Sequence, residues 1–198
     1  MNTANTAPLR IGVLLSGSGR TLQNLIDRTA DGSLAAEIAC VIADREHAYG
    51  LTRARAAGLP AIVEREAEAI YAALRRHRVE LICLAGYLRL LPLAADFVGR
   101  VLNIHPALLP KFGGKDFYGE RVHRAVLAAG ETESGCTVHI CDEQYDRGTI
   151  LLQKRVPVLP DDTVETLAAR VFEAECEAYP EAIGLWLRSS GRRGGQPI

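Results

Sequence analysis

Runs of apolar residues alternate along the chain with segments whose apolar residues recur at helical spacing. The strand-like runs lie at 10–16, 36–44, 60–64, 80–86 and 100–105. The segments of helical spacing lie between them, at 21–32, 51–58 and 66–78. This order predicts a doubly wound, mostly parallel α/β sheet, and such a sheet binds its ligands outside the carboxyl ends of its strands.

The pattern changes after residue 105. A loop rich in Pro, Gly and Lys covers 106–119, and a helical segment follows near 121–130. Two closely spaced strand-like runs come next, at 135–143 and 149–158. Their short connection predicts an antiparallel or mixed edge on the otherwise parallel sheet.

A long helix is predicted at the end of the pattern. Asp162 is followed three residues later by Glu165, a spacing typical of a capping box, and helical spacing then continues toward Trp186. Pro180 is expected to kink or divide this helix. The 198 residues are enough for one α/β domain with a Rossmann-like sheet, which we place at 9–188, with flexible termini at 1–8 and 189–198.

Composition narrows the class of protein. Hydrophobic residues make up 48% and charged residues 24%, which is typical of a globular domain, and a net charge of −1 gives no reason to bind nucleic acid. No apolar stretch reaches the roughly 18–20 residues that span a bilayer, and the N-terminus lacks a signal-peptide pattern. We therefore expect a cytoplasmic protein without membrane contact. Five cysteines without a CxxC pair predict buried free thiols rather than a metal site.

The turn SGSGRT, residues 16–21, is the first candidate for chemistry. Its glycines allow a tight bend, and the helix that follows offers free N–H groups to a phosphate. A dinucleotide fingerprint would need glycine where Leu22 stands, so the motif is incomplete. A phosphate site and a merely structural turn are both compatible with it.

The second candidate is VLNIHP, residues 101–106. Because side chains alternate along a strand, Asn103 and His105 point to the same face, and Pro106 ends the strand at its carboxyl end. An amide and an imidazole together suit an oxyanion formed when a carbonyl is attacked. The alternative is that both side chains only satisfy loop backbone.

A functional histidine would gain from a carboxylate partner, and the residue pattern leaves that partner open. Asp142, Glu143 and Asp146 all follow the strand-like run that starts at 135, and spacing does not choose among them. The remaining histidines are more typical of surface or structural positions: His47, His77, His123 and His139.

Four ordered segments, SGSGRT, LAGYLRLLP, NIHPALLPKFGG and GCTVHICDEQYDRGTILLQ, resemble the phosphoribosylglycinamide formyltransferase family, over roughly residues 9–187. The resemblance implies the formyltransferase fold and transfer of a formyl group from 10-formyltetrahydrofolate to the amine of glycinamide ribonucleotide, in purine biosynthesis and without a metal. Both ligands are small molecules, and a monomer or a homodimer is expected.

The resemblance also implies roles for individual residues. Asn103 and His105 match the catalytic Asn-x-His, and Asp146 matches the carboxylate that raises the pKa of that histidine and keeps it protonated. Four residues match the ribonucleotide site: Gly19, Arg20, Thr21 and Glu175. Thirteen match the folate site: Arg65, Leu88, Arg89, Leu90, Leu91, Asn103, Ile140, Cys141, Asp142, Glu143, Gln144, Tyr145 and Asp146.

Three other interpretations of the function explain part of the same sequence pattern. Formyltetrahydrofolate deformylase shares the catalytic core but normally has an added N-terminal domain, whereas the first strand here begins by Arg10. Methionyl-tRNA formyltransferase normally has an added C-terminal domain and a basic surface. A noncatalytic nucleotide-binding module would use SGSGRT alone and leave Asn103 and His105 to structure.

Overall fold

Seven strands form a single sheet in the computed structural model, which describes residues 7–190. The strands are β1 (Leu9–Leu15), β2 (Ala36–Ala43), β3 (Ala61–Val63), β4 (Leu81–Leu84), β5 (Val101–His105), β6 (Glu133–Ile140) and β7 (Ile150–Pro157). The helices are α1 (Arg20–Ala30), α2 (Tyr49–Ala56), α3 (Ala67–Arg76), α4 (Glu120–Ala128), α5 (Val164–Ser189) and a short 3₁₀ turn at Ala95–Phe97. The flexible termini that the sequence predicts lie almost entirely outside the described residues.

The order of the strands in the sheet is β3-β2-β1-β4-β5-β6-β7. The pairs from β3 to β5 are parallel, whereas β5–β6 and β6–β7 are antiparallel. The predicted parallel sheet with an antiparallel edge is therefore confirmed. Antiparallel pairing at this edge follows from the short loop that joins β6 to β7, which is too short for a parallel crossover.

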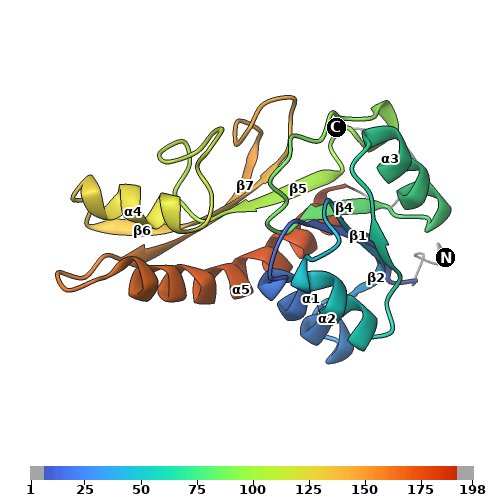
Figure 1. The fold of residues 1–198 in the computed structure, drawn as a ribbon, viewed down its shortest axis with the longest axis horizontal. Coiled ribbons are helices and arrows are strands. Elements are labelled where there is room, and N and C mark those ends of the chain that lie inside the picture. Colours follow the sequence, from blue (N-terminus) through green and yellow to red (C-terminus); the bar gives the residue numbers. More distant parts are fainter. Residues whose placement is uncertain (1–6, 191–198) are drawn as a thin grey trace.

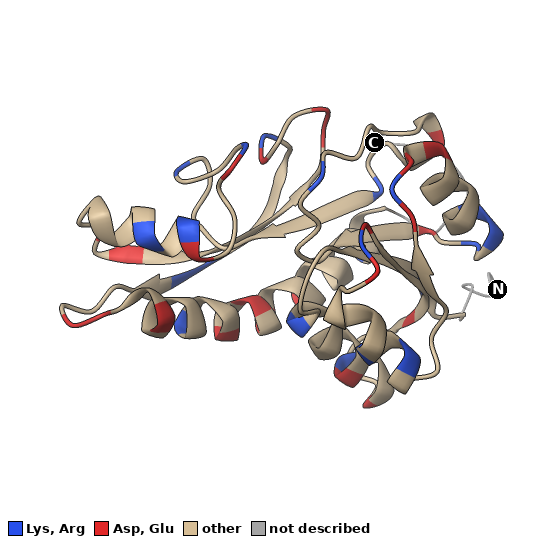
Figure 2. Ribbon diagram, in the orientation of Figure 1, with Lys and Arg blue, Asp and Glu red and all other residues tan. Residues whose placement is uncertain are grey.

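Helices cover both faces of the sheet (Figure 1). Residues from α1, α2 and α5 pack on one face, and residues from α3 and the 3₁₀ turn pack on the other. Strands β1 and β4 are covered on both sides, which explains why they are nearly continuous apolar runs. Acidic and basic residues are interspersed along α4 and α5 (Figure 2), in keeping with the small net charge.

The long helix α5 begins one residue later than predicted. Thr163, not Asp162, is its N-cap, and the side chains of Thr163 and Thr166 form the capping box. Asp162 instead binds the Arg170 guanidinium at 2.6 and 2.9 Å, so its carboxylate is not free to cap the helix. Pro180 lies inside the helix without dividing it.

The central strands bring three loops to one edge of the sheet. Strand β1 pairs with β2 on one side and with β4 on the other, so the chain changes direction across the sheet at β1. The loop after β1 is tied to the loop after β4, because Ser16 N donates to Gly86 O and Leu88 N donates to Ser16 Oγ, each over 3.0 Å. Doubly wound sheets bind ligands at such a switch point.

The cysteines agree with the predicted free thiols. Cys40, Cys83 and Cys136 are buried, and Cys141 and Cys176 are half-buried. Burial raises the pKa of the Cys83 thiol to about 12, so this thiol is inert at neutral pH. Among residues 7–190, no helix is both long and apolar enough to cross a membrane.

Candidate active site

A cavity of about 620 Å³ opens at the carboxyl ends of β1, β4 and β5. Its walls come from the start of α1, the segment 86–91, the loop 114–119, the end of β6 with the loop after it, and one face of α5. Polar side chains of β5 and β6 form its floor. The cavity therefore lies where the doubly wound sheet was expected to bind ligands.

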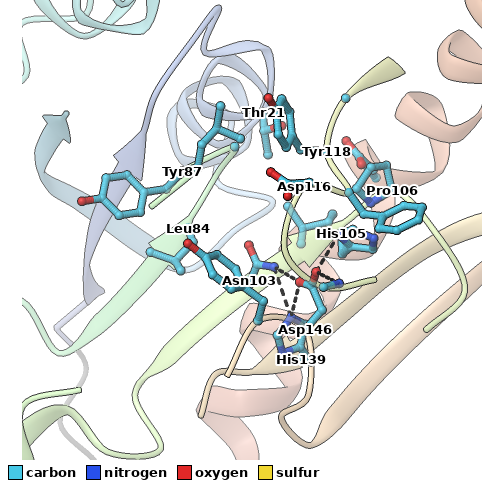
Figure 3. Close-up of a pocket in the computed structure, with 18 of the residues that line it drawn as sticks. Thr21, Leu84, Tyr87, Asn103, His105, Pro106, Asp116, Tyr118, His139 and Asp146 are labelled. Carbon is cyan, nitrogen blue, oxygen red and sulfur yellow. Dashed lines mark hydrogen bonds and ion pairs between the residues drawn. The ribbon is translucent and has the colours of Figure 1, made fainter. Parts of the chain in front are cut away.

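Asp146 is the centre of a four-residue cluster on this floor (Figure 3). Asn103 Nδ2 donates to Asp146 Oδ1 over 3.2 Å, and His105 Nδ1 lies 3.5 Å from Asp146 Oδ2. Strand alternation thus places Asn103 and His105 on one face, as predicted. The structure also selects Asp146 among the three acidic candidates, because Asp142 binds the Gln144 backbone instead.

The loop that follows β5 shapes the surroundings of Asp146. Gly114 N donates to Asp146 Oδ2 over 2.8 Å. A Cβ at Gly113 would require the Leu109 side chain to shift and would crowd the Cβ of Asp146, so glycine lets the loop pass close to Asp146. Asp146 itself has a φ of 55°, in the left-handed region that aspartate tolerates better than most residues. Local backbone geometry thus aims the carboxylate at both imidazoles.

The second ring nitrogen of His105 also has a partner. His105 Nε2 lies 2.8 Å from the Phe112 carbonyl oxygen, so both ring nitrogens face acceptors. Burial nevertheless lowers the pKa of His105 below its ordinary value; Asp146 and the Phe112 carbonyl raise the pKa, but by less. Asp146 therefore raises the pKa of this histidine, as expected, while burial lowers it by more.

The carboxylate of Asp146 stays ionised in this environment. Burial raises the pKa of Asp146, but the hydrogen bond with His139, the charge of His105 and the Gly114 N–H together lower it further than burial raises it. The cluster therefore pairs a carboxylate whose pKa is lowered with an imidazole whose pKa is lowered as well. Two acceptors are already in place around His105 for the imidazolium that proton transfer would create.

His139 is the member of the cluster that the sequence analysis placed elsewhere. It is only 1% exposed, and its Nε2 lies 3.1 Å from Asn103 Nδ2 and 3.5 Å from Asp146 Oδ1. In the antiparallel β5–β6 pair, His139 stands directly opposite Asn103. Opposite residues share a face, and this register was the signal that would have found it.

Two other histidines differ in their surroundings. His123 on α4 lines the cavity, is 5% exposed, and its Nδ1 has no hydrogen-bond partner in the described structure. Burial, and next the charge of His105, lower the pKa of His123. His47 is exposed, as predicted, and lies away from the cavity.

The predicted ribonucleotide residues gather at the opposite end of the cavity from the loop after β6. Gly19 is the N-cap of α1 with a φ of 68°, and Arg20 and Thr21 begin the helix at the cavity wall. Glu175 reaches the same wall from α5 and is 9% exposed. Burial raises the pKa of Glu175 to about 7, although the charge of Arg20 opposes this shift.

Most of the predicted folate residues line the cavity between two segments. One segment contributes Leu88, Arg89, Leu90 and Leu91, and the other contributes Cys141, Asp142, Gln144, Tyr145 and Asp146. Leu88 and Leu90 are 39% and 44% exposed, so both offer apolar surface to a ligand in the cavity.

Three predicted folate residues are not at the cavity wall: Arg65, Ile140 and Glu143. Arg65 donates from Nε to the Asp44 carbonyl over 2.6 Å. Ile140 follows His139 in β6, so strand alternation turns its side chain to the other face. Gly19, a predicted ribonucleotide residue, does not line the cavity either, because it is the N-cap residue in the turn before Arg20.

The described residues include no group of three His, Cys, Asp or Glu side chains arranged to hold a metal ion. The polar groups of the floor are instead paired with one another. The arrangement offers an imidazole, a carboxylate and an amide within hydrogen-bonding reach at the wall of one cavity.

Comparisons with known proteins agree with this geometry. A protein-family model described as "Formyl transferase" matches residues 9–183. The phosphoribosylglycinamide formyltransferase of Haemophilus influenzae is 41% identical over 186 residues, which cover 88% of this chain and 85% of that protein. The crystal structure of glycinamide ribonucleotide transformylase 1 from Symbiobacterium toebii is similar with a TM-score of 0.84 and 42% identity, covering 96% of this chain and 92% of that one.

A relative of a different length is also similar. The trifunctional purine biosynthetic protein adenosine-3 of Drosophila pseudoobscura pseudoobscura is 45% identical over 197 residues. The match covers 93% of this chain but only 14% of that protein. The chain thus spans a small part of the trifunctional relatives and most of the length of the bacterial one.

Proposed function

Because the chain belongs to the formyl transferase family, we propose that it transfers the formyl group of 10-formyltetrahydrofolate to the amine of glycinamide ribonucleotide, as a step of purine biosynthesis. The observation that carries this proposal is the contact of Asp146 with both Asn103 and His105 on the cavity floor. We assign the catalytic unit to residues 9–188 and place its action in the cytoplasm, on small-molecule ligands.

The reaction exchanges one C–N bond for another. The lone pair of the ribonucleotide amine attacks the formyl carbon, and the carbonyl oxygen becomes an oxyanion. When the tetrahedral intermediate collapses, the bond from carbon to N10 of the folate breaks. One proton leaves the attacking nitrogen and one reaches N10, so the chain needs a group that both accepts and donates a proton.

His105 suits this proton transfer because its pKa is lowered. In its neutral form it accepts the proton of the attacking amine after the ring has turned Nε2 from the Phe112 carbonyl toward the cavity, and the imidazolium that results is stabilised by the Asp146 carboxylate. The imidazolium then lies beside the oxyanion and serves as the acid for N10. This order of steps differs from the expectation of a histidine that is protonated at the start.

Asn103 has a different part in the cycle. In the unliganded cluster its amide group is directed to Asp146 and His139. An oxyanion is a stronger acceptor than a neutral imidazole, so one N–H turns from His139 to the formyl oxygen as its charge develops. Preorganised donors of this kind contribute about 10²–10³-fold to the rate.

The two ends of the cavity suit the two ligands. The start of α1 with Arg20 and Thr21 supplies N–H groups and positive charge for a phosphate, and the buried Glu175 carboxyl accepts from ribose hydroxyls. At the other end, Leu88, Leu90 and the loop 141–145 provide apolar and polar surface for the folate ring.

The test is an assay of folate release. The purified protein is mixed with 10-formyltetrahydrofolate, with and without glycinamide ribonucleotide. We expect tetrahydrofolate to appear only when the ribonucleotide is present. Release with water alone would identify a deformylase, and ribonucleotide binding without release would identify a noncatalytic module.

A further inference from the structure

A row of polar side chains crosses three strands next to the floor of the cavity. His105 on β5 stands directly opposite Thr137 on β6, and Thr137 stands directly opposite Gln153 on β7. Opposite residues of antiparallel strands share a face, so the three side chains lie on one side of the sheet. Thr137 is fully buried and Gln153 is half-buried, and neither residue lines the cavity. Thr137 and Gln153 are therefore close to the reacting groups but do not touch a ligand.

Thr137 and Gln153 bind the backbone of the segment that follows His105. Thr137 Oγ1 donates to the Ala107 carbonyl over 2.6 Å and accepts from Leu109 N over 3.0 Å. Gln153 Nε2 donates to the Leu109 carbonyl and to Thr137 Oγ1, each over 2.9 Å. The hydroxyl thus uses its one donor and both of its acceptor positions. We call these four hydrogen bonds the Thr137–Gln153 network.

Leu109 connects this network to the part of the loop that reaches the floor. The Leu109 side chain is buried and lies against Gly113, because a Cβ at Gly113 would have to displace Leu109 Cδ2. The same Cβ would lie 3.2 Å from Asp146 Cβ. Gly113 is thus packed between the residue that the network holds and the carboxylate at the centre of the floor. A shift of Leu109 would move Gly113 relative to Asp146, because protein interiors are close-packed.

The two neighbours of Gly113 contact His105 and Asp146, the catalytic pair. The Phe112 carbonyl oxygen lies 2.8 Å from His105 Nε2, and Gly114 N donates to Asp146 Oδ2 over 2.8 Å. Burial has the largest influence on both groups, because it lowers the pKa of His105 and raises the pKa of Asp146. Against burial, the Phe112 carbonyl raises the pKa of His105, and the Gly114 N–H lowers the pKa of Asp146. A displaced loop would therefore change both members of the pair.

We propose that Thr137 and Gln153 are positioning residues that hold the loop 107–114 in register with the catalytic pair. The loop then supplies one donor to the Asp146 carboxylate and one acceptor that defines the resting orientation of the His105 ring. A catalytic group that must be placed to within about 0.5 Å needs such supporting hydrogen bonds behind it. This inference rests on the proposed function, because it takes the Asp146 carboxylate to stabilise the imidazolium during formyl transfer.

The first measurement is steady-state formyl transfer by Thr137→Val, which keeps the shape of the side chain and removes the hydroxyl. We expect kcat to fall about 10- to 100-fold, since small misplacements of reacting groups cost rates of this order. KM for both substrates should stay near the wild-type values, because Thr137 does not line the cavity. Thr137→Ser retains the hydroxyl and should restore kcat to near the wild-type value.

Gln153 provides a milder test in the same assay, because it is only half-buried. Gln153→Met keeps the length of the side chain and removes its amide, while Thr137 keeps its own bonds to the loop. We expect kcat to fall about 3- to 10-fold, as for the loss of one or two hydrogen bonds. Because both residues act through one network, the double variant should lose less than the product of the two single losses.

The second measurement is an NMR titration of the His105 ring, which needs neither substrate nor turnover. In Thr137→Val, burial still lowers the pKa of His105, but the Phe112 carbonyl that raises it is no longer held in place, so the pKa should fall below its wild-type value. Since His105 acts in its neutral form, the acid limb of the kcat profile should also move to lower pH. The substitution leaves in place the other titratable groups that face His105: Asp146 after β6, His139 on β6 and His123 on α4.

Ser134→Ala is the matched control. Ser134 lies on the same strand as Thr137, is 2% exposed, and its Oγ has no hydrogen-bond partner within residues 7–190. Loss of this buried hydroxyl should leave kcat and the His105 titration as in wild type. Melting temperatures show which variants are folded, and Gln153→Met decides the question if Thr137→Val is not.

A folded Thr137→Val or Gln153→Met protein with wild-type kcat would overturn the inference and leave the network a role in stability alone. A loss of kcat without a shift in the His105 titration would also overturn it, because the loss would then not act through the loop. Losses that multiply in the double variant would refute a single network. The proposed function is judged separately: a wild-type protein that transfers no formyl group, while the His105 titration shifts as expected, would refute the function and not the positioning of His105.

Discussion

The floor of the cavity and its ribonucleotide end differ in how their polar groups are satisfied. On the floor, Asp146 contacts Asn103, His105 and His139, and the second nitrogen of His105 faces the Phe112 carbonyl. At the ribonucleotide end, within residues 7–190, Arg20 has a stacking partner but no acceptor, and the buried Glu175 has no hydrogen bond to its carboxyl group. The polar groups of the floor therefore have partners before a ligand binds, whereas Arg20 and Glu175 at the ribonucleotide end still lack hydrogen-bond partners among the described residues.

This difference separates two tasks. Groups that stabilise a transition state must already be oriented, because reorganisation during the reaction costs rate. Groups that bind a substrate gain most when the ligand supplies the missing partner. Substitutions on the floor should therefore lower kcat, whereas substitutions at the ribonucleotide end should raise KM or weaken binding.

The largest effect on kcat is expected from substitutions of His105 and Asp146 on the floor of the cavity. His105→Ala removes the proton carrier, and Asp146→Asn removes the charge that stabilises the imidazolium. Each should lower kcat by about 10²–10⁴-fold, with KM for the ribonucleotide changed by no more than a few-fold. Steady-state kinetics with both substrates measure the two quantities.

Circular dichroism and melting temperature serve as the control for these two variants. A folded His105→Ala or Asp146→Asn protein that retains near-normal turnover would contradict the roles assigned to the floor. A variant that raises KM and leaves kcat unchanged would erase the distinction between the two regions.

A smaller effect is expected from His139, the member of the floor that contacts Asp146 and Asn103 and to which we assign no proton transfer. His139→Ala removes the partner that orients Asp146 and Asn103, and we expect kcat to fall about tenfold. His139→Gln keeps a donor at this position and should recover part of the loss. Equal kcat values for the alanine variant and wild type would leave His139 with a packing role only.

The smallest effect concerns stability, at the ribonucleotide end. Burial raises the pKa of Glu175 to about 7, above its value in the unfolded chain. The folded state therefore binds this proton more tightly, and the contribution to stability is present below about pH 4.5 and is lost as pH rises through about 7. Glu175→Gln should be more stable than wild type near pH 8 by on the order of 2–3 kcal/mol.

Chemical denaturation of both proteins at several pH values measures this difference. The advantage of the glutamine variant should vanish toward acid pH, where wild-type Glu175 is protonated as well. A difference independent of pH would show that the carboxyl group is not strained by burial in the unliganded protein.

Local sequence patterns were sufficient to predict most of the fold. The run RIGVLLS predicted a strand at 10–16, and β1 covers Leu9–Leu15. The antiparallel edge followed from the short connection between two strand-like runs, and β6 and β7 pair in this way. These features depend on neighbouring residues, which the sequence displays directly.

Features that depend on contacts across the chain were not predictable in the same way. The N-cap of α5 is Thr163 rather than the expected Asp162, because the Asp162 carboxylate binds the guanidinium of Arg170, two turns further along. His139 joined the floor through its register with Asn103, and strand alternation alone does not fix which residues pair across strands. The stacking of Arg20 on Phe172 likewise joins two helices that are far apart in the sequence.

The central claim is that the Asp146-centred floor transfers a formyl group to the ribonucleotide amine. The most direct measurement follows an isotopically labelled formyl group by NMR, starting from labelled 10-formyltetrahydrofolate with glycinamide ribonucleotide, for wild type and His105→Ala. The account predicts that the label appears as a formamide of the ribonucleotide with wild type and stays on the folate with His105→Ala. Label released as free formate, or equal transfer by both proteins, would contradict it.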